Sequence, residues 1–240
     1  MSNGLFNLTV ETNTADEAWL HWYNLLSNVN DKAESRDGSV VGEIINAVTI
    51  IKDPTRCIMQ NPIRNMSMRY AVGELLWYMS GSNKLSGIGF YTKAWERMSD
   101  DGETVNSNYG NCIKYKYGFD QWEYVKGLIK KDKNTRQAVI HIKDACNHLE
   151  TPTKDMNCTV CLQFFVRNVD GEDKLFMTTY MRSNDVWMGF PFDVFNFTAM
   201  QIKMAMELNI GLGSYTHITG SLHLYERDFE KAKENMAKLK

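Results

Sequence analysis

The strongest candidate for covalent chemistry in this sequence is Cys158. A cysteine thiolate is a good nucleophile, and arginines close to it would favour the thiolate. Arg182 opens a polar segment that ends at Asp193 and contains a serine, an asparagine and Asp185. A glycine and a proline punctuate this segment, so we expect a turn before a helix. Its arginine, hydroxyl, amide and carboxylate groups together suit an anionic polar ligand.

Two other interpretations of Cys158 are open. Cys161 follows it in the Cys-x-x-Cys spacing of redox and zinc sites. In a strand, residues three apart point to opposite faces, so the two thiols would diverge, and no second pair completes a four-ligand set. We therefore expect no metal site. Both cysteines could also be small core residues. The five cysteines of the chain are an odd number, which favours reduced thiols over a disulfide framework.

The composition is that of an ordinary globular protein. The 240 residues are 43% hydrophobic and 23% charged, and a net charge of -2 gives no global attraction to polyanions. Nucleic acid is therefore not an expected partner, although an arginine cluster could still bind a single phosphate. Residues 1–10 lack a basic region followed by a long apolar run, and no stretch is long enough to span a membrane. We expect a cytoplasmic protein with no membrane partner.

Helices and strands must position these residues, and the sequence predicts both without a clean alternating order. Helix formers and apolar spacing predict helices at residues 15–29, 68–81, 91–98, 119–131, 194–209 and 225–240. β-branched and alternating stretches predict strands at 40–52, 138–142, 159–167, 175–182 and 213–224, a hairpin turn at 170–173, and loops at 30–39 and 102–110. This mixture favours an α+β fold. No repeat or Pro-rich linker interrupts the chain, so we expect one domain, residues 1–240.

Seven stretches, in order along the chain, resemble motifs of the thymidylate synthase family. The segment from Arg182 to Phe192 resembles the family signature, Arg-Ser-x-Asp followed by Gly-x-Pro-Phe. The others resemble the mobile phosphate loop, the Glu-Leu-Leu-Trp helix, a Tyr-Gly loop, the arginine turn lent to a partner subunit, the nucleophile with a following glutamine, and the His-x-Tyr near the sugar. In this sequence they are Arg36-Asp37-Gly38, Glu74-Leu75-Leu76-Trp77, Tyr109-Gly110, Asn134-Thr135-Arg136, Cys158 with Gln163, and His223-Leu224-Tyr225.

The resemblance implies a thymidylate synthase-like fold, a central mixed β-sheet with flanking helices, one sheet face of which is used to form a homodimer. It also implies a nucleotide site whose 5′-phosphate is bound by arginines, one of them from the second subunit, and whose sugar is held by a histidine and a tyrosine. The implied substrate-binding residues are Arg36, Arg136, Gln163, Arg182, Ser183, Asp193, His223 and Tyr225. Gln137 stands where the family usually has a second arginine, which weakens the expected contact from the partner.

For catalysis, the resemblance implies that Cys158 adds to carbon 6 of a pyrimidine and that 5,10-methylenetetrahydrofolate donates the one-carbon unit. Glu74 would place or activate a water molecule that captures this unit as a hydroxymethyl group. Asp185 is implied in catalysis and in contact with the pterin. Trp95 and Tyr109 complete the expected folate site.

Departures from the synthase pattern are informative about substrate and product. Thymidylate synthases carry an asparagine at the position of Asp193, where it pairs with uracil. A carboxyl group can accept from the amino group of cytosine and, when protonated, donate to its ring nitrogen, so Asp193 favours dCMP. The sequence in this respect resembles the deoxycytidylate hydroxymethylases of bacteriophages, with which it shares residues 106–110 and 181–186. A viral origin would place it in the host cytoplasm.

Two more departures favour capture of the one-carbon unit by water over its reduction by hydride from folate. Thr159 replaces the histidine that usually follows the family's cysteine, and the chain ends about 15 residues after Tyr225, too soon for the long tail that closes over folate. Several alternatives stay open: methylation of dUMP or dCMP, hydroxymethylation of dUMP or CMP, and a nucleotide-binding protein without catalysis. The joint presence of Cys158, Glu74 and Arg182 argues against the last.

Overall fold

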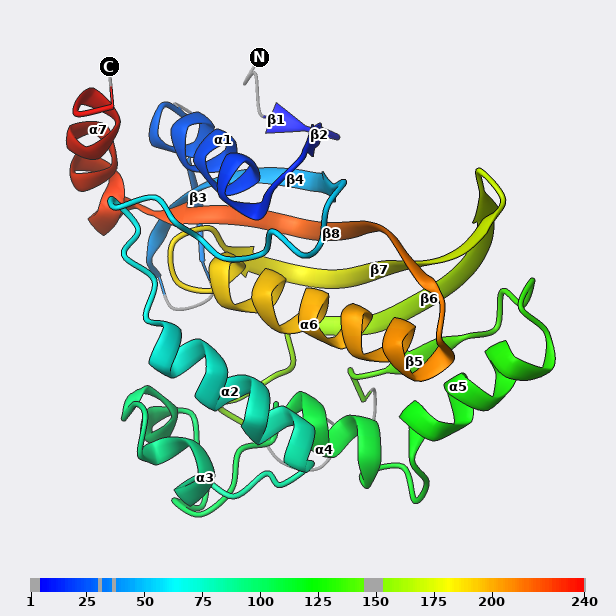
Figure 1. The fold of residues 1–240 in the computed structure, drawn as a ribbon. Coiled ribbons are helices and arrows are strands. Elements are labelled where there is room, and N and C mark those ends of the chain that lie inside the picture. Colours follow the sequence, from blue (N-terminus) through cyan, green and yellow to red (C-terminus); the bar gives the residue numbers. More distant parts are fainter. Residues whose placement is uncertain (1–4, 30–31, 36–37, 145–152, 240) are drawn as a thin grey trace.

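A mixed β-sheet forms the centre of the molecule in the computed structural model, which describes residues 5–29, 32–35, 38–144 and 153–239. Within these residues eight strands join one sheet, in the order β1-β4-β8-β7-β6-β5, with β2 and β3 also paired to β4 (Figure 1). β7 runs parallel to β8, whereas β4 is antiparallel to β8 and β6 is antiparallel to β7. The strands are β1 (Leu5–Phe6), β2 (Thr9–Thr12), β3 (Lys32–Glu34), β4 (Val40–Ile51), β5 (Val139–His141), β6 (Thr159–Val169), β7 (Glu172–Asp185) and β8 (Gly211–Tyr225).

Two helices, α1 (Ala15–Ser27) and α6 (Phe190–Leu208), lie against the same face of this sheet, α1 over β4 and α6 over β7 and β8 (Figure 1). α7 (Phe229–Ala237) packs beside α1. The remaining helical elements are α2 (Met68–Ser80), α3 (Ser86–Gly89), α4 (Tyr109–Lys114), α5 (Gln121–Lys131) and the 3-10 turns η1 (Ala94–Arg97) and η3 (Glu226–Asp228). None of the helices in the described ranges has the length and apolar composition needed to cross a bilayer.

The two faces of the sheet differ in burial. On β6, Leu162, Phe164 and Val166 are buried toward the helices, whereas the alternating residues Cys161 and Phe165 are only partly buried. The same alternation runs along β7, β8 and β4. A sheet with one covered face and one partly exposed apolar face has a surface available to another molecule.

Local sequence chemistry explains several element boundaries. Thr14 and Glu17 form a capping box at the start of α1. Asp170 and Gly171, with φ angles of 55° and 86°, make the two-residue turn between β6 and β7. Positive φ at both central residues gives a turn whose twist matches the strands, so the predicted hairpin is confirmed.

The α+β class is confirmed, and so are the long helices and strands, within a few residues at their ends. The errors lie in the short elements. Residues 91–98 form only the turn η1, after the unpredicted helix α3, and the loop predicted to reach residue 110 ends where α4 begins. The strands β1, β2 and β3 were not predicted, because their few residues carry no clear alternation.

A further correction concerns the polar segment from Arg182 to Asp193. Residues 183–185 are the end of β7 rather than a turn, because they continue to pair with β8 at Ser183 and Asp185. The following helix starts at Phe190 instead of residue 194, with Pro191 in its first turn. Proline fits the first turn of a helix because the missing N–H would have no partner there. Long-range strand pairing thus outweighed the local composition.

Candidate active site

Cys158 lies directly before β6, beside the end of β7. Its carbonyl oxygen accepts a hydrogen bond of 2.8 Å from the backbone N–H of Arg182. The Arg182 guanidinium is tied to the carbonyl oxygens of Met156 and Asn157, and its Nη2 lies 3.6 Å from the Cys158 Sγ. The Ser183 side chain also hydrogen-bonds to the thiol. The structure therefore brings together three residues that the sequence placed at one site.

The Cys158 thiol is less acidic than the sequence led us to expect. Its half-buried position raises the pKa, and this desolvation outweighs the opposing effect of the Arg182 charge. Asp193 and Asp155 raise the pKa further, while Ser183 lowers it. Arg182 thus favours the thiolate, as expected, but burial has the larger effect and the net shift of the pKa is upward.

Glu74 is a buried carboxyl group on α2 with only 5% of its surface exposed. Tyr70, one turn earlier on the same helix, donates a hydrogen bond of 2.5 Å to Oε1, and Asn196 of α6 donates one of 2.7 Å to Oε2. Burial raises the pKa of Glu74 to about 7, although the hydrogen bonds from Tyr70, Asn196 and Tyr78 act to lower it. A carboxyl group with this pKa can give or take a proton near neutral pH.

Trp95 is linked to Glu74 through Tyr70. Its Nε1 donates a hydrogen bond of 3.1 Å to the Tyr70 hydroxyl, and its ring meets Trp77 edge-on at 5.5 Å. The Tyr70 ring in turn packs edge-on against Phe192 at 4.7 Å. The tryptophan expected at the folate site and the carboxyl group expected at the water thus belong to one hydrogen-bonded group.

Asp193 lies in the first turn of α6 and is partly buried. Burial and the charge of Glu74 hold its pKa well above the ordinary value, although a hydrogen bond with Asn184 acts to lower it. Tyr109 is buried nearby, stacked on Tyr78 at 5.0 Å, and its pKa is raised by burial and then by Asp193 and Cys158. These mutual effects place Glu74, Asp193, Tyr109 and Cys158 in one electrostatic neighbourhood.

Asp185 ends β7 opposite His223 of β8. Its Oδ1 accepts hydrogen bonds from the backbone N–H groups of Trp187 and Met188, at 2.7 and 3.0 Å. Burial raises the pKa of Asp185 despite these bonds and despite the opposing effect of His223. The His223 ring meets Tyr225 edge-on at 5.3 Å, as expected for residues two apart on a strand, whose side chains point to the same face of the sheet.

Two of the expected site residues in the described part of the chain do not join this group. Arg136 is exposed, and its carbonyl oxygen accepts a hydrogen bond of 3.3 Å from Gln163. Gln163 lies on the open face of the sheet, five residues and therefore about 16 Å along β6 from Cys158. Arg36 lies outside the described residues.

Several residues of the site were missed from the sequence. Tyr70 precedes Glu74 by four residues and Asn196 follows Asp193 by three, so helical spacing could have pointed to both. Arg64 had no such signal. Its guanidinium lies 5.2 Å from the ring centres of both Trp187 and Phe192, and burial lowers its pKa while Asp185 acts to raise it.

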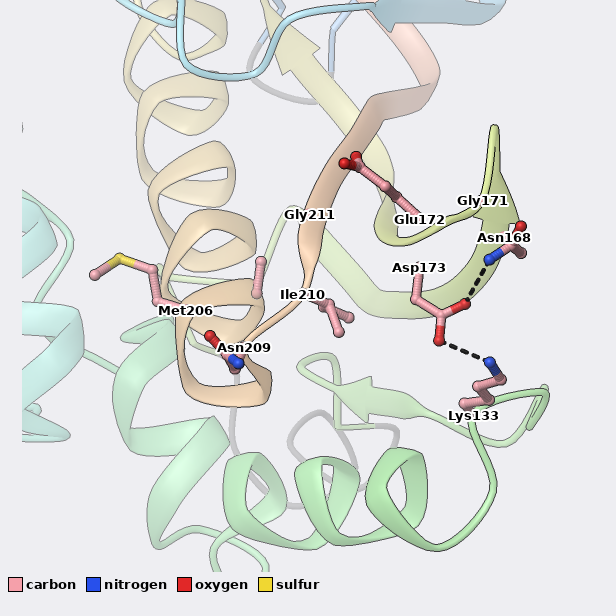
Figure 2. Close-up of a pocket in the computed structure, with 10 residues that line it drawn as sticks. Lys133, Asn168, Gly171, Glu172, Asp173, Met206, Asn209, Ile210 and Gly211 are labelled. Carbon is pink, nitrogen blue, oxygen red and sulfur yellow. Dashed lines mark hydrogen bonds and ion pairs between the residues drawn. The ribbon is translucent and has the colours of Figure 1, made fainter.

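A hollow of about 910 Å³ lies away from these residues, beside the β6–β7 turn. Figure 2 shows Asp173 at its wall, hydrogen-bonded to Asn168 and paired with Lys133. None of the site residues predicted from the sequence lines this hollow. The turn stands at the end of β6 and β7 opposite to Cys158 and Arg182, so the hollow is separate from the candidate site.

Comparison with known proteins agrees with the motifs. The family model described as thymidylate synthase matches residues 22–240. A deoxyuridylate hydroxymethyltransferase of Bacillus phage SP01 is 32% identical over 204 residues, 80% of this chain, and the chain spans only about half of that relative, 52% of its length. A putative thymidylate synthase of Methanothermobacter marburgensis is 27% identical over 228 residues, which cover 92% of this chain and 96% of the relative.

Proposed function

The chain belongs to the thymidylate synthase family, and we propose that within this family it transfers a hydroxymethyl group to carbon 5 of dCMP. As a member of the family it is a transferase of one-carbon units that acts on a pyrimidine nucleotide. The phage relative supports a hydroxymethyl product, because that protein is a hydroxymethyltransferase. The identity of the base rests on this chain's own residues.

The observation that carries the proposal is the partly buried carboxyl group of Asp193, whose pKa is held well above its ordinary value beside Cys158. A neutral carboxyl group has one donor and one acceptor. It can therefore accept from the amino group of cytosine and donate to the ring nitrogen next to it. A charged carboxylate would face that nitrogen with lone pairs only.

Cys158 is the proposed nucleophile. Addition of its sulfur to carbon 6 of the pyrimidine makes carbon 5 nucleophilic and divides a difficult substitution into easier steps. Arg182 and Ser183 act on the thiol directly and lower its pKa against the effect of burial. The same two residues are the proposed phosphate ligands, with Arg36 and, from a second subunit, Arg136. His223 and Tyr225 are proposed to hold the sugar.

Glu74 is the proposed acid–base group for the water step. Its pKa of about 7 leaves it part protonated and part charged at neutral pH. Tyr70 and Asn196 each occupy one carboxyl oxygen and fix the orientation of the group. A fixed base next to the reacting carbon would take a proton from water as it attacks the one-carbon unit.

5,10-Methylenetetrahydrofolate supplies the one-carbon unit when bound, and the residues present fit it. Trp95, Phe192 and Tyr109 offer aromatic rings beside Glu74 and Asp193. Asp185 has a carboxyl group oriented by two backbone N–H groups, which suits the amine and ring N–H donors of a pterin. We assign these four residues to the folate.

A homodimer is part of the proposal. The partly exposed apolar face of the sheet supports it, since a second copy of the sheet would cover residues such as Phe165 and Cys161. Arg136 is exposed next to Gln163 on this face, where it could reach a partner's site. We place the reaction in the cytoplasm, where thiols stay reduced, since the cysteines of the described residues are free.

The alternative substrate is dUMP. The phage relative is a deoxyuridylate enzyme, and a neutral carboxyl group can also pair with uracil if its donor and acceptor exchange places. The two substrates share every other residue of the proposed site. The alternative product, a methyl group formed by hydride transfer, shares the steps up to carbon–carbon bond formation.

The test is incubation of the pure protein with methylenetetrahydrofolate and either dCMP or dUMP, followed by mass analysis of the nucleotide and of the folate. We expect hydroxymethyl-dCMP and tetrahydrofolate. A methylated product with dihydrofolate would overturn the water step. Turnover of dUMP alone would overturn the assignment of the base.

A further inference from the structure

A buried hydrogen-bonded group stands behind Asp193, on the strands β7 and β8. His217 is fully buried, and its Nδ1 lies 2.8 Å from the hydroxyl of Tyr215. Its Nε2 lies 2.9 Å from the amide of Asn184, which is 3% exposed. None of these side chains has a role in the proposed chemistry.

The amide of Asn184 lies between His217 and Asp193. A carbon atom added to Gly189 would lie 2.6 Å from the Asn184 Oδ1 and 3.2 Å from the Asp193 Oδ2, so the two oxygens border the same small space. Asn184 also acts to lower the pKa of Asp193, as expected for two side chains this close. With its nitrogen toward His217, however, the amide leaves its buried oxygen without a hydrogen-bond partner. An unpaired buried oxygen is costly.

Turning the amide over gives both of its polar atoms a partner. Burial lowers the pKa of His217 to about 3, so the ring is neutral and has one nitrogen that donates and one that accepts. When Tyr215 donates to Nδ1, Nε2 carries the hydrogen and requires an oxygen opposite it. The amide oxygen of Asn184 then accepts from His217, and its nitrogen donates to the Asp193 Oδ2.

We propose that His217 is a specificity-determining positioning residue, which fixes the amide of Asn184 and through it the oxygen of Asp193 that carries the proton. Donors then run in one direction from Tyr215 through His217 and Asn184 to Asp193. Such a chain strengthens its own members. The inference rests on the proposed function, because it assumes that Asp193 pairs with the base.

The consequence is a choice between bases. An oxygen that accepts from Asn184 carries no proton, so the proton of neutral Asp193 stays on Oδ1. With Oδ1 opposite ring nitrogen 3 and Oδ2 opposite position 4, the protonated Oδ1 donates to ring nitrogen 3 of cytosine, and Oδ2 accepts from its amino group. Uracil in the same place would set its N–H against a hydrogen and its carbonyl against an oxygen. If the Asn184 amide were not fixed, the proton of Asp193 could lie on either oxygen, and the carboxyl group could then pair with cytosine or with uracil.

The experiment compares the kcat/KM values of the full-length protein for dCMP and dUMP, and the Kd of each nucleotide without folate. For His217→Leu we expect the dCMP to dUMP ratio to fall by at least about tenfold, as for loss of one discriminating hydrogen bond. His217→Gln retains an amide donor and should recover most of the ratio. Tyr215→Phe should lower it less, because His217 can still donate to Asn184.

The control is Trp122→Phe, which removes a 2.8 Å hydrogen bond from the buried Trp122 to Glu207, near the end of α6 opposite to Asp193. It should leave the ratio unchanged whatever it does to stability. A His217→Leu protein that binds both nucleotides with the wild-type ratio would overturn the inference, as would equal losses for the two bases. Failure of the wild-type protein to process dCMP is a separate result, because it would overturn the proposed function itself.

Discussion

The pKa values of carboxyl groups are shifted in opposite directions at the two ends of the β6–β7 hairpin. At the turn, Asp173 is bound by Lys133 at 2.7 Å and by Asn168 at 3.2 Å, and these contacts hold its pKa below the ordinary value (Figure 2). At the other end, burial raises the pKa of Asp185 and of Asp193. The carboxylate at the turn is exposed to water and paired with a lysine. The carboxyl groups at the other end are harder to ionise in the folded protein than in the unfolded chain.

The direction of these pKa shifts distinguishes the candidate active site from the hollow better than the volume of the hollow does. The hollow at the turn is large, about 910 Å³, but its walls hold an ordinary ion pair. Carboxyl groups with raised pKa values and a nearby thiol are the features expected of acid–base and covalent chemistry. Shifts of this kind cost stability, so they persist where chemistry needs them.

The largest expected effect comes from Cys158→Ser. Loss of the nucleophile should lower kcat by at least about 10⁴-fold, as for other enzymes deprived of a covalent nucleophile. Binding of dCMP should stay within a few fold, since Arg182 keeps its contacts with the carbonyl oxygens of Met156 and Asn157. Steady-state turnover and nucleotide titration measure the two quantities. Normal turnover by this variant would contradict the covalent mechanism.

Glu74→Gln should lower kcat by about 10² to 10³-fold, the usual contribution of a general acid or base. As a base, Glu74 must be charged, so the wild-type kcat should rise with pH through about 7, the pKa of this group. The glutamine variant should lack this rise. A variant that keeps the pH dependence would show that another group takes the proton from water.

Asp193→Asn should move the base preference toward uracil. An amide has no ionisable proton, and an asparagine is the residue that thymidylate synthases carry at this position. We therefore expect the dCMP to dUMP ratio of kcat/KM to fall by about 10² or more. Competition between the two nucleotides in one reaction measures the ratio. A variant that still prefers dCMP would show that the base is read elsewhere.

The sequence predicted much of this site but not its interior. Motif resemblance found Cys158, Glu74, Arg182 and Asp193, because each belongs to a short pattern whose order along the chain is informative. It could not find His217, which is an unremarkable histidine in a strand until the fold places it against Asn184. Buried networks of this kind join residues far apart in the chain, and no local spacing announces them.

The fold shows the same division between local and distant information. The turn at Asp170 and Gly171 was predicted because two adjacent residues determine it. The end of β7 was not, since residues 183–185 are polar and become a strand only by pairing with β8. The net rise of the Cys158 pKa could not be predicted for a similar reason, because the sequence shows a neighbouring charge but not the depth of burial.

The stability of the protein should depend on Glu74 in a pH-dependent way. The folded protein holds this proton more tightly than the unfolded chain, with a pKa of about 7 against 4.5. The stabilisation is therefore complete below pH 4.5 and is lost as the pH rises to about 7, at a cost of about 3 kcal/mol. Urea unfolding at pH 5 and pH 8 should show Glu74→Gln gaining about this much relative to wild type at the higher pH. An equal difference at both pH values would contradict the raised pKa.

The smallest effect is expected at the other end of the hairpin. Asp173→Asn should leave kcat/KM unchanged and shift the unfolding midpoint by at most about 2 °C, because an exposed ion pair contributes little. Its pH dependence should also have the opposite sign. The folded pKa is lowered by Lys133, so the stabilisation exists above pH 3.8 and is lost as the pH falls through the folded pKa. A loss of activity in this variant would break the contrast between the two ends, since it would give the hollow a part in the reaction; thermal unfolding and turnover measured on one preparation decide the point.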